Sequence, residues 1–110
     1  MPRPRKNAPT RAFDALGNPT RRAIVRILGD GPRSVGEIAA ELPVSRPAVS
    51  KHLRLLSDAK LVAHHADGVR NVFRLERAGF EAARRWLDAF WDDALARFAM
   101  VAENLPEEDS

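Results

Sequence analysis

The spacing of hydrophobic positions changes twice along the chain, and each change marks a new kind of element. Over residues 11–58 apolar side chains recur at intervals of three and four, which is the period of an amphipathic helix. Residues 61–66 and 69–75 are typical of strands, and the Asp67-Gly68 pair between them favours a tight turn. Helical spacing returns at about 78–104. The pattern predicts a mainly α fold with a small β-hairpin, in the order α-α-α-α-β-β-α.

Capping residues, prolines and glycines divide the first helical region into separate helices. We expect the first helix over Arg11–Leu16, stopped by Gly17, which suits the left-handed conformation after a helix end. Asn18-Pro19 then starts the second helix, because Asn18 can cap it and proline is tolerated in the first turn. Ser34 and Glu37 have the spacing of a capping box, in which each side chain bonds to the other's backbone N–H. A third helix therefore starts at Ser34.

The fourth helix, expected over Ser45–Asp58, separates apolar from polar side chains. Val49, Leu53 and Leu56 fall within about 40° of one another on a helical wheel and would face the core. The other face carries side chains suited to contacting bases in a DNA groove and to holding phosphates. The candidate DNA-binding residues of this helix are Ser45, Arg46, Pro47, Ser50, Lys51 and Arg54. An ordinary amphipathic surface helix satisfies the same pattern, so the neighbouring elements have to distinguish it from a DNA-binding helix.

The elements around the fourth helix favour DNA binding. Two short helices joined by a tight turn, the second with polar residues at its N-terminal end, form a helix-turn-helix unit. A hairpin directly after such a unit is the winged-helix arrangement, whose tip touches the sugar-phosphate backbone or the minor groove. With an Asp67-Gly68 turn, Val62 opposes Phe73 and His65 opposes Arg70. Arg70 is the candidate DNA contact on this wing, and a purely structural hairpin is the alternative.

The last predicted helix carries a broad aromatic stripe. A domain of this size has too little remaining core to cover all of the stripe, so part of it should bury against a second copy of the chain. The first helix is expected to join this interface. The candidate dimer-interface residues are Phe13, Leu16, Phe80, Leu87, Phe90, Trp91, Leu95 and Phe98. The alternative is that the stripe packs only against Phe13 and Leu16 of the same chain.

Charge divides the chain into two unlike parts. Residues 1–75 carry 14 Lys and Arg against six Asp and Glu, a net charge of +8, whereas residues 76–110 carry four against nine, a net charge of −5. A basic first part suits a polyanion such as double-stranded DNA, and an acidic, aromatic second part suits packing against protein. The 110 residues fit one small domain, without room for a deep active site.

Two charged ends with few apolar residues flank the expected domain. Residues 1–10 form a Pro-rich, basic arm that cannot offset the entropy of being ordered, so we expect it to be flexible. Its Arg5 is a candidate contact to the DNA backbone, although a disordered tail with a minor electrostatic effect is the favoured interpretation. The winged helix-turn-helix domain occupies residues 11–104, and an acidic tail follows at 105–110. The other candidate backbone contacts are Ser34, His52 and His65.

The sequence offers little for catalysis or for metal binding. It contains no cysteine, which excludes disulfides, thiolate zinc sites and a cysteine nucleophile and fits a reducing compartment. His64 and His65 are adjacent in a predicted strand, so they point to opposite faces and cannot easily bind one ion together. No apolar run approaches the roughly 20 residues that cross a bilayer. We expect a cytoplasmic protein that is not an enzyme and that needs neither a metal nor a cofactor.

Several stretches of the chain together closely resemble the ArsR-type winged-helix repressors. They are A-L-G-N-P-T-R-R-A-I-V-R-I-L from Ala15, S-V-G-E-I-A-A-E-L from Ser34, S-R-P-A-V-S-K-H-L-R-L-L from Ser45, and A-K-L-V with a D-G-V-R hairpin. The resemblance covers about Phe13 to Leu75. It implies a dimeric bacterial transcription regulator that pairs through its first and last helices and places the Ser45 helix in the major groove. The metal-sensing members carry a Cys-bearing motif at the positions of Glu37–Leu42, or Asp and His ligands on the last helix. Here the first segment reads E-I-A-A-E-L and the last helix has no His, so the chain is more similar to the metal-independent branch.

These observations lead to two functional hypotheses. The first is a sequence-specific DNA-binding transcription regulator, a homodimeric repressor of its own and neighbouring genes that binds a near-palindromic operator. The second is a sensor that releases DNA when a small molecule, less readily a metal, enters the aromatic dimer interface around Phe90, Trp91 and Phe98. A winged helix used only for protein contacts is disfavoured by the basic first part of the chain. The sequence indicates neither the operator nor the effector.

Overall fold

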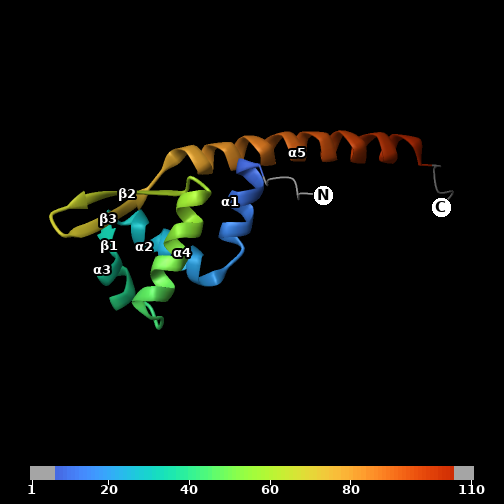
Figure 1. Cartoon of the computed structure of the whole chain (residues 1–110). Coiled ribbons are helices and arrows are strands. Elements are labelled where there is room, and N and C mark those ends of the chain that lie inside the picture. Colours follow the sequence, from blue (N-terminus) through green and yellow to red (C-terminus); the bar gives the residue numbers. More distant parts are fainter. Residues whose placement is uncertain (1–6, 106–110) are drawn as a thin grey trace, which may run out of the picture.

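The computed structural model describes residues 7–105 and has the predicted mainly helical architecture (Figure 1). Its elements are, in chain order, α1 (Ala8–Leu16), α2 (Pro19–Gly29), β1 (Arg33–Ser34), α3 (Val35–Ala40), α4 (Arg46–Asp58), β2 (Val62–Asp67), β3 (Arg70–Leu75) and α5 (Arg77–Asn104). The predicted order of helices and hairpin is confirmed, with the short strand β1 in addition. None of the helices in the described residues combines the length and the apolar character needed to cross a membrane.

Side-chain caps fix where the first helices begin. The Oδ1 atom of Asn7 accepts a hydrogen bond from the backbone N–H of Thr10 at 3.0 Å, so α1 begins at Ala8 rather than at the expected Arg11. Residues 8–10, which we had expected in the basic arm, are therefore helical. Gly17 follows α1 with φ −72°, a right-handed conformation in place of the left-handed one expected.

The three later caps match their predictions. Asn18 accepts from the backbone N–H groups of Thr20 and Arg21 at the start of α2. At α3 the predicted capping box is complete, because Glu37 N donates to Ser34 Oγ at 3.2 Å and Ser34 N donates to Glu37 Oε1 at 3.1 Å. Ser45 Oγ accepts from the backbone N–H of residue 48 at the start of α4. These starts could be predicted because each depends only on residues two or three positions apart.

The three strands form an antiparallel sheet in the order β1-β3-β2, and the register of the hairpin differs from our prediction. Val62 lies opposite Leu75 instead of Phe73, and Arg70 lies opposite Asp67 instead of His65. The two turn residues are therefore 68 and 69, not 67 and 68. Gly68 has φ +65°, and glycine at the first central position is the pattern of a type II′ turn.

The core lies between the helices and the inner face of the sheet. Its largest fully buried side chains come from α2, α3, α4 and the start of the hairpin: Ile24, Ile38, Val49, Leu53, Leu56, Leu61 and Val62. The predicted apolar stripe of α4 is confirmed, because all three of its members are in this set. Burial of one full stripe fixes the rotation of α4 about its axis and turns its other face outward.

Helix α5 lies across one end of the domain, far from the start of α4 (Figure 1). Its first turns are tied to the segment after α4, because Gly79 N donates to Lys60 O at 2.9 Å and Glu76 N donates to Leu61 O at 2.9 Å. Lys60 makes this approach with φ 61°, a left-handed conformation that is uncommon outside glycine. Helix α1 packs along the following turns of α5, and the rest of α5 runs past the other elements.

Candidate DNA-binding surface

The outward face of α4 presents the predicted DNA-binding side chains. All six candidates on this helix are exposed: Ser45, Arg46, Pro47, Ser50, Lys51 and Arg54. Five of them lie at the cap or in the N-terminal half of α4, at the end remote from α5, and Arg54 lies just past the middle of the helix (Figure 1). An exposed helix end with hydroxyl and guanidinium groups has the shape and chemistry to enter a major groove.

Arg46 is held against the start of α3. A Cβ atom on Gly36 would lie only 2.6 Å from Arg46 Nη2 and 3.0 Å from its Cζ. The guanidinium group therefore packs directly on the backbone of Gly36, in space that any other residue would fill. This contact could not be predicted from the sequence, because it joins two helices through residues ten positions apart.

Arg70 on the wing faces the same part of α3. Strand β1 pairs with β3 so that Ser34 lies opposite Val72, and this pairing brings the capping box of α3 beside the base of the wing. Arg70 Nη2 then lies 3.7 Å from Glu37 Oε1. Between the wing, α3 and the start of α4 is a hollow of about 540 Å³. Its lining residues include Glu37, Arg46, Arg70 and Asn71.

Glu37 is ionised in this position. The hydrogen bonds from Ser34, the backbone N–H first and the hydroxyl second, hold the pKa of the Glu37 carboxyl below its usual value, and the positive charges of Arg70 and Arg33 lower it further. Burial acts in the opposite direction but does not prevail. The hollow is therefore lined by a negative charge as well as by the cations of Arg46 and Arg70.

His52 lies on the side of α4 next to α2 and is only partly exposed. Arg21 Nη1 is 3.3 Å from His52 Nδ1, and the same guanidinium donates through Nε to Ala15 O at 2.6 Å. Partial burial lowers the pKa of His52, and the charges of Arg21 and Lys51 lower it further. A neutral imidazole can accept the hydrogen bond from Arg21, so this contact links α1, α2 and α4.

The other candidate backbone contacts lie in unlike surroundings. Ser34 is buried and its hydroxyl caps α3. His65 is exposed on β2, opposite Val72. Arg5 lies outside the described residues. Among residues 7–105 there is no group of three His, Cys, Asp or Glu side chains that could hold a metal ion.

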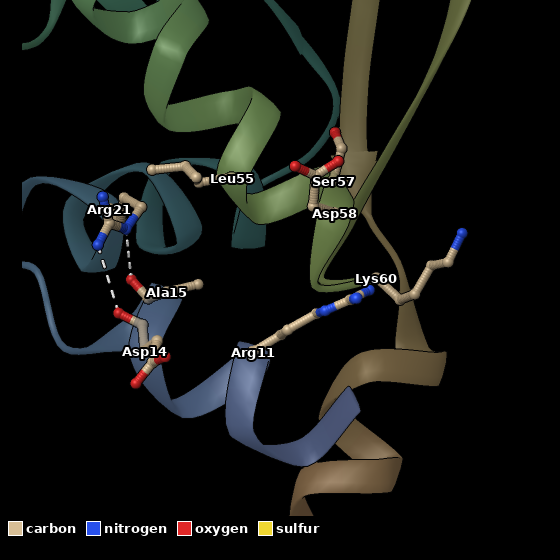
Figure 2. Close-up of a pocket in the computed structure, with 8 residues that line it drawn as sticks. All are labelled: Arg11, Asp14, Ala15, Arg21, Leu55, Ser57, Asp58 and Lys60. Atoms are coloured by element: carbon tan, nitrogen blue, oxygen red, sulfur yellow. Dashed lines mark hydrogen bonds between the residues drawn. The ribbon is translucent and has the colours of Figure 1, made fainter. Parts of the chain in front are cut away.

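A second hollow, of about 570 Å³, lies on the other side of α4 (Figure 2). It is formed by α1, α2, the end of α4 and Lys60. Figure 2 shows the guanidinium of Arg21 turned toward the carbonyl groups of Ala15 and Asp14, while the side chain of Arg11 extends toward Lys60. Arg21 could not be singled out from the sequence, because the partners of its side chain lie on two other helices, α1 and α4.

The candidate dimer residues divide into two groups. Leu16 and Phe80 are half-buried and pack against the core of the same chain. The remaining candidates on α5 are exposed, and their exposed fraction rises from 38% at Leu87 to 71% at Phe98. Phe13 and Trp86 make an edge-to-face contact with ring centroids 5.4 Å apart, and Trp86 stacks on Phe90 at 5.3 Å. Intramolecular packing therefore covers only the first part of the stripe.

Comparisons with known proteins agree with this architecture. A helix-turn-helix domain family matches residues 16–65. The chain is 48% identical over 97 residues to the HTH-type transcriptional regulator Rv2034 of Mycobacterium tuberculosis, covering 88% of this chain and 91% of that protein.

Two solved structures extend the likeness to the fold. An ArsR-like transcriptional regulator from Rhodococcus sp. RHA1 matches with a TM-score of 0.73 and 34% identity, over 89% of this chain and 95% of that one. The homodimeric winged helix-turn-helix DNA-binding domain of Mb0332 from Mycobacterium bovis matches with a TM-score of 0.62 and 25% identity, over 91% and 88%. The chain belongs to the ArsR-type family of winged helix-turn-helix proteins and is a DNA-binding regulator of transcription.

Proposed function

We propose that the protein is a homodimeric repressor that binds a near-palindromic operator at its own promoter and those of neighbouring genes. In each copy the start of α4 enters the major groove, and the wing tip with Arg70 lies on the sugar-phosphate backbone. The observation that carries the proposal is the exposed polar and cationic face of α4, held outward by a fully buried stripe. Bases are distinguished in the major groove by side chains of this kind.

The uncovered stripe of α5 supports the dimer. Exposed contiguous apolar surface on a small domain usually marks a protein interface. The stripe begins where α1 stops covering α5 and includes Phe90, Leu95 and Phe98. The homodimeric Mycobacterium bovis domain has the same fold. Two copies paired in this way would present two α4 helices to half-sites about one turn of DNA apart, roughly 10 base pairs.

Repression follows from the way a small dimer would occupy a promoter. A protein bound across two half-sites excludes RNA polymerase from the same DNA, without an enzymatic step. We place the protein in the cytoplasm with its DNA, and in the metal-independent branch of the family. The absence of cysteine from the sequence and of histidine from α5 supports that branch.

The decisive experiment measures operator binding by two variants of α4. Lys51→Ala and Arg54→Ala each remove an exposed side chain, so the fold should remain intact. Loss of a good contact to a base or phosphate costs about 1–3 kcal/mol, and we expect the Kd for the operator to rise about tenfold or more. Arg85→Ala removes an equally exposed cation from α5 and is the control. If Lys51→Ala and Arg54→Ala both bind like the wild type in a gel-shift titration at fixed salt, the proposal is wrong.

A second candidate function is that of an effector sensor. The observation that favours it is the run of ring contacts from Phe13 through Trp86 and Phe90 to Trp91, all partly exposed. A flat apolar molecule could insert into this run where two copies meet and separate them from DNA. The tryptophan fluorescence of the dimer should then change with one member of a metabolite panel. Unchanged fluorescence across the panel would argue against this function.

A further inference from the structure

Two arginines and one carboxylate meet in the hollow between the wing and α4. Arg46 lines it from the start of α4, beside Gly36, and Arg70 lines it from the wing, beside Glu37 at the start of α3. The three residues come from three elements, all three are exposed, and Arg46 and Arg70 are themselves candidate DNA-binding residues. One anion is thus already present where the DNA backbone, itself a chain of anions, is expected to pass.

The contact between Arg70 and Glu37 is easily exchanged for another. The nitrogen and oxygen are 3.7 Å apart, and the two side chains are 56% and 48% exposed. Exposed ion pairs of this kind contribute little to stability. A guanidinium group can bind a phosphate through two parallel hydrogen bonds, which is a stronger arrangement. A phosphate can therefore take Arg70 from Glu37 without disturbing the fold.

Glu37 itself is not free to leave. Its Oε1 atom also accepts the backbone N–H of Ser34 at 3.1 Å, within the capping box that starts α3. Movement of the carboxylate would leave that N–H group without its partner and weaken the helix start. The hydrogen bonds from Ser34 also keep the pKa of the carboxyl low, so its charge persists at neutral pH.

We propose that this hollow receives one phosphate of the DNA backbone, held by Arg46 and Arg70, and that Glu37 is a competing anion that weakens the binding. The inference rests on the proposed DNA-binding function and adds Glu37 as a residue that weakens DNA binding. Glu37 holds Arg70 in the free protein, and its fixed charge repels the phosphate in the complex. The regulator therefore binds its operator less tightly than its cationic residues alone would allow.

Glu37→Gln tests the proposal without damaging the helix. Glutamine also completes a capping box, so only the charge is removed. We expect the Kd for the operator to fall about threefold to tenfold and the salt dependence to steepen by up to about one phosphate contact. Glu41→Gln, at the other end of α3, removes an exposed charge that does not line the hollow and should change the Kd little. A Glu37→Gln variant that binds no more tightly than the wild type, or than Glu41→Gln, overturns the proposal.

A double-variant experiment shows whether Glu37 acts through Arg70. In an Arg70→Gln background, Glu37→Gln should increase operator affinity by a smaller factor, because the arginine that Glu37→Gln releases is absent. A gain that persists undiminished would mean that Glu37 acts only by general repulsion, and the proposed exchange would be wrong. Failure of the underlying function has a different signature: the wild type itself would then show no salt-dependent operator binding, or Lys51→Ala and Arg54→Ala would leave that binding unchanged.

Gly36→Ala tests the other side of the hollow. The added methyl group would occupy the space of the Arg46 guanidinium and displace it. Alanine is preferred to glycine within a helix, so the melting temperature should stay the same or rise. We expect operator affinity to fall about fivefold, close to the loss of one charged contact. Gly29→Ala, which has no atom within 4 Å of its added methyl, is the control. Equal affinity of the two variants would exclude Arg46 from the phosphate site.

Discussion

The outward face of α4 and the outer part of α5 are both exposed, but they are exposed in different ways. On α4 the exposed side chains are hydroxyl and cationic groups, which water solvates well. On α5 they are aromatic and aliphatic groups, and the exposed fraction of Phe98 reaches 71%. Polar side chains at a surface need no partner, whereas a contiguous apolar stripe indicates one. The stripe of α5 is thus the stronger sign of a protein partner. The cations of α4 indicate only that the ligand is an anion.

These two regions are connected by a short segment held by backbone hydrogen bonds. The end of α4 and the start of α5 are joined through Lys60, whose carbonyl group accepts the N–H of Gly79. The geometry of a dimer formed by α5 would therefore set the distance and angle between the two α4 helices. The apolar stripe of α5 would therefore determine where the polar face of α4 is placed on DNA. Substitutions can change the two surfaces separately.

The largest effect is expected from a charge in the apolar stripe. Phe98→Glu places a carboxylate where a second copy should pack, and burying an unpaired charge costs about 3–5 kcal/mol. The dimer should weaken by at least about a hundredfold, because 1.4 kcal/mol corresponds to a factor of ten. Phe98 is largely exposed in the single chain, so the monomer should still fold. Analytical ultracentrifugation measures the dimer, and a gel shift should show a parallel loss of operator binding.

Ala96→Glu is the matched control for this experiment. Ala96 is also exposed, but it lies about 160° around the helix from Phe98. The same charge on that face should leave the dimer intact. If both variants remain dimeric, the second copy does not bind at the stripe. A dimer partner would then not explain why α5 exposes apolar side chains where α4 exposes polar ones.

A smaller effect is expected from Gly79→Ala, which changes the connection between the regions. A Cβ atom on Gly79 would collide with the carbonyl oxygen of Ala59 and lie 2.5 Å from that of Lys60. These are backbone atoms, which cannot turn aside as a side chain can. Overpacking of this kind costs about 1–3 kcal/mol, which lowers the melting temperature of a domain this size by about 5–20 °C. A melting temperature unchanged in circular dichroism would show that the segment is not rigid.

The sequence could predict most of what depends on one helix at a time, although the Asn7 cap of α1 and the conformation of Gly17 were missed. The cap of α4 at Ser45 and the buried stripe of Val49, Leu53 and Leu56 were predicted residue by residue. The presence of the hairpin was also predicted correctly, but its strand register was not. Moving the turn by one residue shifts the pairing by two, which leaves every side chain on the same face, so alternation cannot distinguish the two registers. Strand β1, with two residues, is too short to show any period.

Contacts between elements explain the rest of the candidate site. The outward residues of α4 could be selected from its helical period, but the contact of Arg46 with Gly36 and that of Arg70 with Glu37 could not. The second depends on the pairing of β1 with β3, which brings the start of α3 beside the wing, and the first joins the starts of α3 and α4. Glu37 was assigned only a capping role from its spacing to Ser34. Its second contact has no signal in a single sequence.

The smallest effect concerns the side of α4 that faces α2 rather than DNA. Partial burial, then the charges of Arg21 and Lys51, lower the pKa of His52 in the folded protein. The unfolded chain therefore binds a proton more readily than the folded one, and stability must fall as the pH drops below about 6.5. Above that pH both states are neutral, and the contribution of His52 to pH dependence disappears. His52→Gln should flatten this part of the stability curve.

The measurement compares melting temperatures at fixed protein concentration between about pH 5 and pH 8, because dimer formation makes them depend on concentration. The wild type should lose stability toward the acidic end more steeply than His52→Gln does. Parallel curves for the wild type and His52→Gln would contradict the prediction. A flatter curve for His52→Gln would instead show that His52, partly buried beside α2, contributes to the pH dependence of stability separately from the cationic outward face of α4.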